Sequence, residues 1–233
     1  MTINTERLAQ VTTLKSGSHR PNNDADFCVM EAVAYVAGEP WSDHPGCTCP
    51  AITAFMVSWN DGLPNDDERA RLLLPLIPAL VGTRGTTALE TRRANMAADW
   101  YIRVQTPAWL RLAGLTTQAA TLEAFPEITD FAKVPALKPT LDAIRKDAAA
   151  AWAAAWAVAG AAVWDAAGAA AGDAARAAVW DAARAAAWAA AWDAAGAAAR
   201  AAVWARDALA PTVAALQESA VDLVKRMCAE KDQ

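Results

Sequence analysis

Residues 152–204 read WAAAWAVAGAAVWDAAGAAAGDAARAAVWDAARAAAWAAAWDAAGAAARAAVW. Every fourth position from Trp152 to Trp204 is Trp, Gly or Arg, and Ala fills most of the positions between them. Alanine is the strongest helix former, and a run of this length overcomes the nucleation cost that limits short helices. The segment from Ala148 to Ala208, called the Ala/Trp tract below, is therefore predicted to be helical.

The tryptophans of the tract cannot all share one face of a straight helix. Four residues turn an α-helix by about 400°, so the repeated position drifts by about 40° per repeat. Several indole rings would then face water, although each can bury about 150–250 Å². Tryptophans at 152 and 192, 156 and 188, and 164 and 180 mirror each other about Gly172. We therefore predict an antiparallel helical hairpin over residues 139–167 and 173–210; one continuous, self-associating helix is the alternative.

The composition narrows the classes of partner. The chain has 233 residues, of which 21 are basic and 26 acidic, for a net charge of -5 and with no basic run. This balance argues against nucleic acid as a partner. Asp and Arg recur through the tract, and each would cost a few kcal/mol at the centre of a bilayer, so a membrane is not an expected partner either. The first ten residues lack the layout of a signal peptide, and we expect a cytoplasmic protein.

The remaining sequence is typical of an all-α protein, because no segment shows sustained alternation of polar and apolar residues. A break in composition at residue 139 predicts two domains, an N-terminal helical domain over 1–138 and a C-terminal unit over 139–233 with the hairpin and a final amphipathic helix. Helices are predicted over Phe27–Ala37, Pro50–Trp59, Asp66–Val81, Thr87–Val104, Pro107–Ala113, Thr117–Ala124 and Val213–Lys231.

Reactive side chains are densest near the N-terminus. Cys28 precedes a loop in which His44, Cys47 and Cys49 have the spacing His-x-x-Cys-x-Cys, and these four side chains are candidate ligands of a tetrahedral zinc site. The simpler alternative is that the cysteines pack as small apolar residues and no cofactor is bound. Cys28 as a nucleophile, with His19 or His44 as its base, is a further interpretation. No complete catalytic motif occurs, so we lean towards a protein that is not an enzyme.

Aromatic and polar residues also suggest a recognition surface. Six residues in the loop and at the end of the next helix form this candidate binding patch: Trp41, Asp43, His44, Trp59, Asn60 and Asp61. A tryptophan at the end of a helix serves more often as a core anchor, which is the alternative for Trp59.

The run CVMEAVAYVAGEPWSDHPGC over Cys28–Cys47 and the run LLPLIPALVGTR over Leu73–Arg84 carry a resemblance. With Pro50–Asp61 between them, they resemble a family of uncharacterised proteins from actinobacteria and their phages. The resemblance covers about residues 16–115 and implies a biological setting but no mechanism. The Ala/Trp tract is similar to helical repeats in proteins assigned to bacterial toxin immunity.

These observations lead to one hypothesis with two alternatives. The first is a non-enzymatic protein of phage or host origin that binds a protein partner, in an immunity or counter-defence role, through long helical faces. The second is a zinc-binding or metal-dependent module built on Cys28, His44, Cys47 and Cys49. The third is a structural protein that self-associates as a homo-oligomer.

Overall fold

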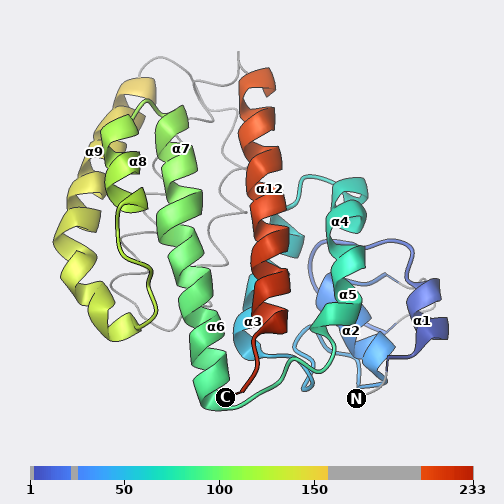
Figure 1. The fold of residues 1–233 in the computed structure, drawn as a ribbon. Helices are drawn as coiled ribbons and strands as arrows, with labels where there is room; N and C mark the ends of the chain where they lie inside the picture. The colour runs from blue at the N-terminus through green and yellow to red at the C-terminus, as the bar shows by residue number, and fades with distance from the viewer. Residues whose placement is uncertain (1–2, 22–25, 157–205, 233) are drawn as a thin grey trace.

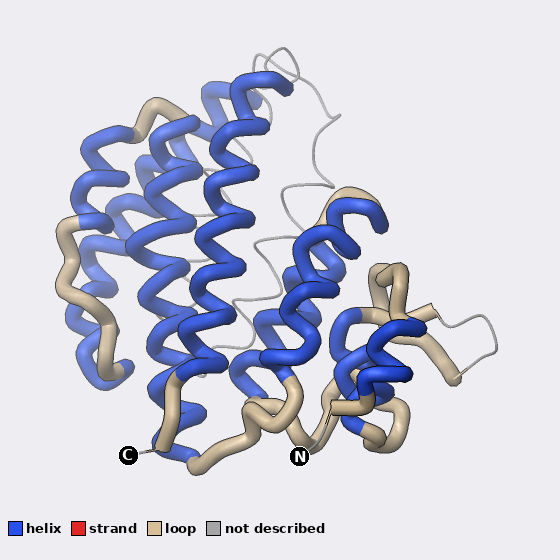
Figure 2. The backbone as a smooth tube through the Cα atoms, turned by 45° about the vertical axis from the view of Figure 1, so that its right-hand side comes forward, coloured by secondary structure: helices blue, strands red, loops and turns tan. Residues whose placement is uncertain are grey.

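A computed structural model describes residues 3–21, 26–156 and 206–232 of the chain. All regular elements in these ranges are helices and none is a strand, so the all-α prediction is confirmed (Figures 1 and 2). The turn of the predicted hairpin, at Gly172, lies outside the described residues. No helix within the described ranges combines the length and apolar character needed to cross a bilayer.

The helices follow the predicted order along the chain. The first half contains α1, α2, α3, α4, the 3₁₀ helix η1 and α5 over Thr5–Gln10, Val29–Ala37, Pro50–Gly62, Asp66–Leu73, Leu74–Leu76 and Ile77–Leu80. The second half contains α6, the π-helix η2, α7, α8, the 3₁₀ helix η3, α9 and α12 over Thr87–Trp100, Tyr101–Gln105, Thr106–Leu112, Thr116–Glu123, Phe131–Leu137, Lys138–Trp156 and Arg206–Ala229.

Local chemistry explains where α2 and α3 begin and end. Cys28 caps the first turn of α2, and Gly38 ends the helix with a left-handed φ of 74°, which glycine adopts without strain. Pro50 occupies the first turn of α3, where its missing N–H is not needed. At the other end of α3 the buried Arg69 donates through Nε to the carbonyl of Asn60 at 2.8 Å and through Nη2 to that of Leu63 at 3.0 Å.

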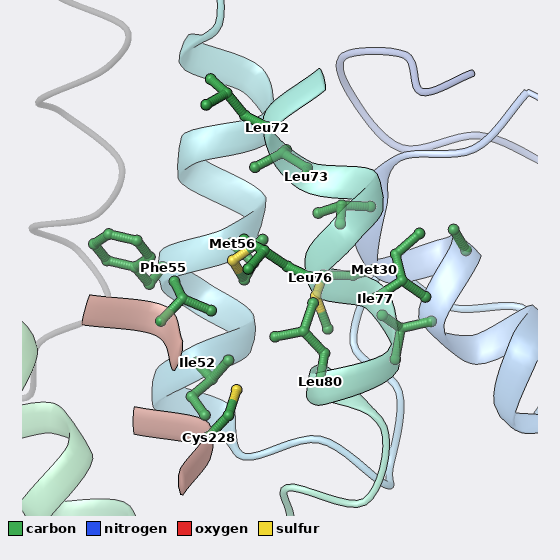
Figure 3. Close-up of a cluster of buried hydrophobic side chains, with 14 of the residues drawn as sticks. Met30, Ile52, Phe55, Met56, Leu72, Leu73, Leu76, Ile77, Leu80 and Cys228 are labelled. Carbon is green, nitrogen blue, oxygen red and sulfur yellow. The ribbon is translucent and has the colours of Figure 1, made fainter. Parts of the chain in front are cut away.

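The first core cluster joins α2, α3, η1 and α5 to one face of α12. Figure 3 shows the buried side chains of α4, η1 and α5 turned towards Ile52 and Met56 of α3 and Met30 of α2. Full burial of a side chain of this size contributes about 1.5–3 kcal/mol, so this cluster is a main source of stability. From α12 it contains Ala220, Leu223, Val224, Met227 and Cys228.

The second core cluster lies between α6, α7, α8 and α9. Its buried members include Ile102 of η2, Trp109 and Leu110 of α7, and Leu141 of α9. Val213 and Leu216 of α12 pack against it as well, so α12 touches both clusters (Figure 1). In the described residues, therefore, helices from the predicted domains 1–138 and 139–233 share both cores.

The end of α12 is fixed by a buried arginine on α6. Arg93 is 2% exposed, and its guanidinium donates to the carbonyls of Met227 at 2.7 Å, Glu230 at 2.9 Å and Thr83. The neighbouring Arg92 is only half-buried and donates to the Lys231 carbonyl at 2.7 Å. Trp100 adds a bond from Nε1 to the Ser219 hydroxyl at 2.7 Å. These contacts hold the second half of α12, from Ser219 to its C-terminal end, against α6.

Candidate functional site

Residues 15–21, called the N-terminal strap below, cross the start of α2 and the end of α3. The strap is held by backbone bonds: the Lys15 amide donates to the Phe27 carbonyl at 2.7 Å, and the Gly17 amide donates to Asp61 Oδ1 at 2.6 Å. Asn60 is fully buried and accepts from the Val29 amide at 3.1 Å while donating to the Lys15 carbonyl at 2.8 Å. Asn60 therefore joins α2, α3 and the strap at one point.

A buried carboxylate lies beneath this strap. Glu31 is 1% exposed, and its carboxylate accepts from the His19 amide at 2.5 Å and the Cys28 amide at 2.7 Å. The His19 ring contributes a third contact, from Nδ1 to Oε2, at 2.9 Å. A buried carboxylate requires such partners, because an unpaired charge in the interior is strongly unfavourable. Glu31 thus closes the capping box of α2 and fastens the strap to it.

The geometry of Cys28 does not favour nucleophilic chemistry. Its sulfur accepts from the Glu31 amide at 3.4 Å, as a helix cap does. Burial is the largest influence on this thiol and raises its pKa to about 12, and the nearby Glu31 charge acts in the same direction. A thiol with this pKa is protonated at neutral pH, whereas the thiolate is the nucleophile. The Nδ1 atom of the His19 ring is paired with the Glu31 carboxylate.

The predicted zinc ligands are not brought together. His44 is exposed and pairs with Asp43 at 2.8 Å, while Cys47 and Cys49 are buried in the first core cluster. The Cys47 sulfur lies 3.7 Å from the Thr48 hydroxyl. In the part of the chain that the structure describes, no three His, Cys, Asp or Glu side chains are grouped to hold a metal ion. The four residues do not fit a tetrahedral site as placed, and zinc binding remains a prediction.

The six residues of the predicted binding patch divide into inner and outer positions. Trp41 donates from Nε1 to the His19 carbonyl at 2.8 Å and stacks on Phe27 at a centroid distance of 5.0 Å, so it binds the strap at His19, while Asn60 and Asp61 bind it at Lys15 and Gly17. Trp59 meets Phe55 edge-on at 5.9 Å. Asp43 and His44 form the outward-facing part, and recognition by this patch remains a prediction.

The π-helix η2 is a feature that the sequence analysis missed. π-helical turns are rare and frequently occur at functional sites. At its end Gln105 Oε1 and Thr106 Oγ1 are buried and have no hydrogen-bond partner among the described residues. The available signal was Pro107, because a proline inside a continuous helix has no N–H and its ring disturbs the carbonyl four residues earlier.

Comparison with known protein families, with curated proteins and with solved structures found no match. What the chain does must therefore be inferred from its own residues and their geometry.

Proposed function

We propose that the chain is a non-enzymatic protein-binding factor whose Ala/Trp tract docks against a protein partner. The tract holds seven of the 11 tryptophans of the chain, at positions 152, 156, 164, 180, 188, 192 and 204. Tryptophan is enriched among the residues that dominate binding energy at protein interfaces, and amphipathic helices bind by laying such anchors into an apolar groove.

The observation that carries the proposal is the anchoring of the tract at both ends. At its N-terminal end, α9 buries Leu141, Ile144 and Ala148 in the second core cluster. After it, α12 buries Leu223 and Val224 in the first core cluster. A segment attached at both ends to a packed body loses less conformational entropy on binding than a free tail, which favours affinity.

The chemistry of the N-terminal strap also supports a role without catalysis. Glu31 and His19 are engaged with each other, and Cys28 is a protonated helix cap. These contacts stabilise the fold, and the raised pKa keeps the Cys28 thiol protonated at neutral pH, whereas a catalytic nucleophile needs a pKa matched to its reaction. The phage or host setting comes from the resemblance of residues 16–115 to actinobacterial and phage proteins, the immunity role comes from the similarity of the Ala/Trp tract to repeats of toxin-immunity proteins, and we propose both as the biological context.

The test is capture of a partner followed by reconstitution with purified components. The bait is the full chain with an affinity tag at the N-terminus, because the tag must not disturb Glu230 and Lys231, which bind Arg93 and Arg92. A protein recovered from a lysate of the source organism is identified, purified and titrated by calorimetry. The titration compares the natural chain with a triple variant of the tract, Trp180→Ala, Trp188→Ala and Trp192→Ala.

A matched control replaces three residues at the same repeat position, Arg176→Ala, Arg184→Ala and Arg200→Ala. Both variants keep the alanine background, so equal circular dichroism spectra would show equal helix content. Truncating a tryptophan hot spot costs about 2 kcal/mol or more, so we expect at least about 30-fold weaker binding by the tryptophan variant. The arginine variant should bind within a few-fold of the natural chain. Recovery of no partner, or equal affinity of the tryptophan variant, would contradict the proposal.

A further inference from the structure

The N-terminal strap is bound to the rest of the molecule mainly through its backbone. Lys15 and His19 each use both the amide and the carbonyl group, and Gly17 between them uses its amide. Apart from the bond to the Phe27 carbonyl, the partners of these groups are side chains, namely those of Glu31, Trp41, Asn60 and Asp61. Bonds to the main chain give affinity for a peptide segment, and side-chain contacts then select its sequence.

The surface beneath the strap carries negative charge. Lys15 Nζ donates to Asp66 Oδ2 at 2.6 Å, while Glu31 and Asp61 accept from the strap amides. Arg69 pairs with Asp66 and offsets one of these three carboxylates. Complementary charge favours the correct partner and disfavours others, so this surface suits a basic segment.

The strap contributes little apolar burial of its own. From Lys15 to Arg20 its residues alternate between partly buried and exposed, and none of residues 15–21 is fully buried. The residues on either side differ, because Leu14 and Phe27 both belong to the first core cluster. Segments with few buried apolar contacts open at a low cost in free energy. The strap can therefore leave its site while the core on either side stays packed.

We propose that the strap is a displaceable internal ligand, and that the surface it covers binds a basic, glycine-containing segment of a partner protein in its place. The surface consists of Glu31, Trp41, Asn60, Asp61 and Asp66. The recognised segment has Lys or Arg two residues before its glycine and His two residues after it, as the strap has. This inference does not depend on the binding role of the Ala/Trp tract.

The requirement for glycine comes from the backbone of the strap. Gly17 has a φ of 81°, a left-handed conformation that glycine adopts without strain. A Cβ atom at this position would meet no other atom within 4 Å, so conformation and not crowding sets the requirement.

The experiment measures the binding of a fluorescent peptide, KSGSHRP, to the full chain by anisotropy; the peptide has the sequence of residues 15–21. Gly17→Pro weakens the strap within the chain, because proline has no N–H to donate to Asp61 and cannot adopt a φ of 81°. The apparent affinity of a covered surface is reduced by the fraction of chains in which it is free. We therefore expect Gly17→Pro to bind the peptide at least about ten-fold more tightly than the natural chain.

Two controls separate recognition from non-specific binding. Ser18→Ala changes an exposed neighbour of Gly17 and keeps every backbone donor, so it should bind the peptide as the natural chain does. A peptide that carries Lys15→Glu places a carboxylate against Asp66, and its affinity for Gly17→Pro should be at least about ten-fold weaker.

Hydrogen exchange tests the strap of the natural chain without a substitution. The amides of Gly17 and His19 should exchange together, at least about 100-fold faster than the amide of Met56 in the buried part of α3. Exchange as slow as that of Met56 would show that the strap opens only when the whole fold does, and would overturn the proposal.

The binding results can overturn the proposal as well. Equal affinity of the natural chain and Gly17→Pro, no binding to either, or equal binding of the two peptides would each do so. Loss of the folded state in Gly17→Pro, seen by circular dichroism, would have the same meaning, because a ligand that can be displaced cannot be required for folding.

Discussion

Among single residues, Arg93 should contribute most to holding α12 in place. The substitution Arg93→Met tests this. The substitution keeps the length of an apolar side chain but removes every donor, leaving the carbonyls of Thr83, Met227 and Glu230 without their partner. Hydrogen bonds from a charged donor contribute about 1.5–3 kcal/mol each. The guanidinium no longer has to be desolvated, which offsets part of the loss, so we expect the free energy of unfolding to fall by about 3–5 kcal/mol.

The assay is urea denaturation followed by circular dichroism, with hydrogen exchange to locate the change. Exchange should accelerate most at the amides of α12 from Ser219 onward. Arg92→Met is the matched control, because Arg92 is the adjacent arginine and its side chain is 34% exposed. A contact this exposed contributes at most about 1 kcal/mol. If Arg93→Met lowered the free energy of unfolding by less than about 1 kcal/mol, or by no more than Arg92→Met does, Arg93 would not be the main contact that holds α12 in place.

Three further outcomes follow from the strap and its surroundings. Glu31→Gln replaces an acceptor oxygen by a donor that faces other donors, so the free energy of unfolding should fall by about 2 kcal/mol in chemical denaturation, and an unchanged midpoint would count against the role of Glu31. The hydrogen bond from Lys15 holds the pKa of Asp66 below its usual 3.8, so stability from this pair is present above that pH and is lost as the pH falls through the lower folded-state pKa. The difference in melting temperature between the natural chain and Asp66→Asn should therefore shrink in acid, and a difference independent of pH would refute this. Burial raises the pKa of both thiols, and Cys28 is 2% exposed against 9% for Cys228, so Cys28 should be alkylated by iodoacetamide in the native state later than Cys228; peptide mapping that found Cys28 labelled first would contradict the burial argument.

Local patterns predicted the helices well but their caps less well. The apolar run of α2 and its end before Gly38 were predicted correctly, whereas the helix predicted from Phe27 begins at Val29, after its cap Cys28. Cysteine is not a usual cap, and the only signal for it was a glutamate three residues later. Thr87 stands three residues before Glu90, the spacing of a capping box, but the cap of α6 is Thr86, whose hydroxyl accepts from the Leu89 amide at 3.3 Å.

Contacts across long stretches of sequence were beyond local reasoning. His19 was recognised as a possible base, but no sequence pattern indicates that the polar loop containing it returns across the helix that follows. The amphipathic character of α12 was predicted, but the partners of its buried Leu223 and Val224 in the first core cluster were not. An amphipathic pattern states which face a helix buries and leaves open the surface that covers it.

The predicted zinc site also shows that local sequence patterns do not fix which residues meet in space. Spacing brought His44, Cys47 and Cys49 into one loop, yet Cys47 and Cys49 lie in the core while His44 faces solvent. In an irregular loop, sequence spacing alone does not fix the direction of a side chain. The loop contains proline and glycine, which are typical of turns, so neighbouring side chains in it are expected to point in different directions.

At one position in η2, Val104, the presence of a residue matters more than its identity. A π turn accommodates one residue more than the α-helix around it, and each residue of an α-helix turns the chain by about 100°. All residues after Gln105 are therefore rotated relative to an uninterrupted helix, and in that orientation Trp109 and Leu110 reach the second core cluster. Replacing the exposed Val104 changes little, whereas deleting it would turn both side chains out of their core at once. Related chains would be expected to vary freely at position 104 while keeping the same number of residues in this segment.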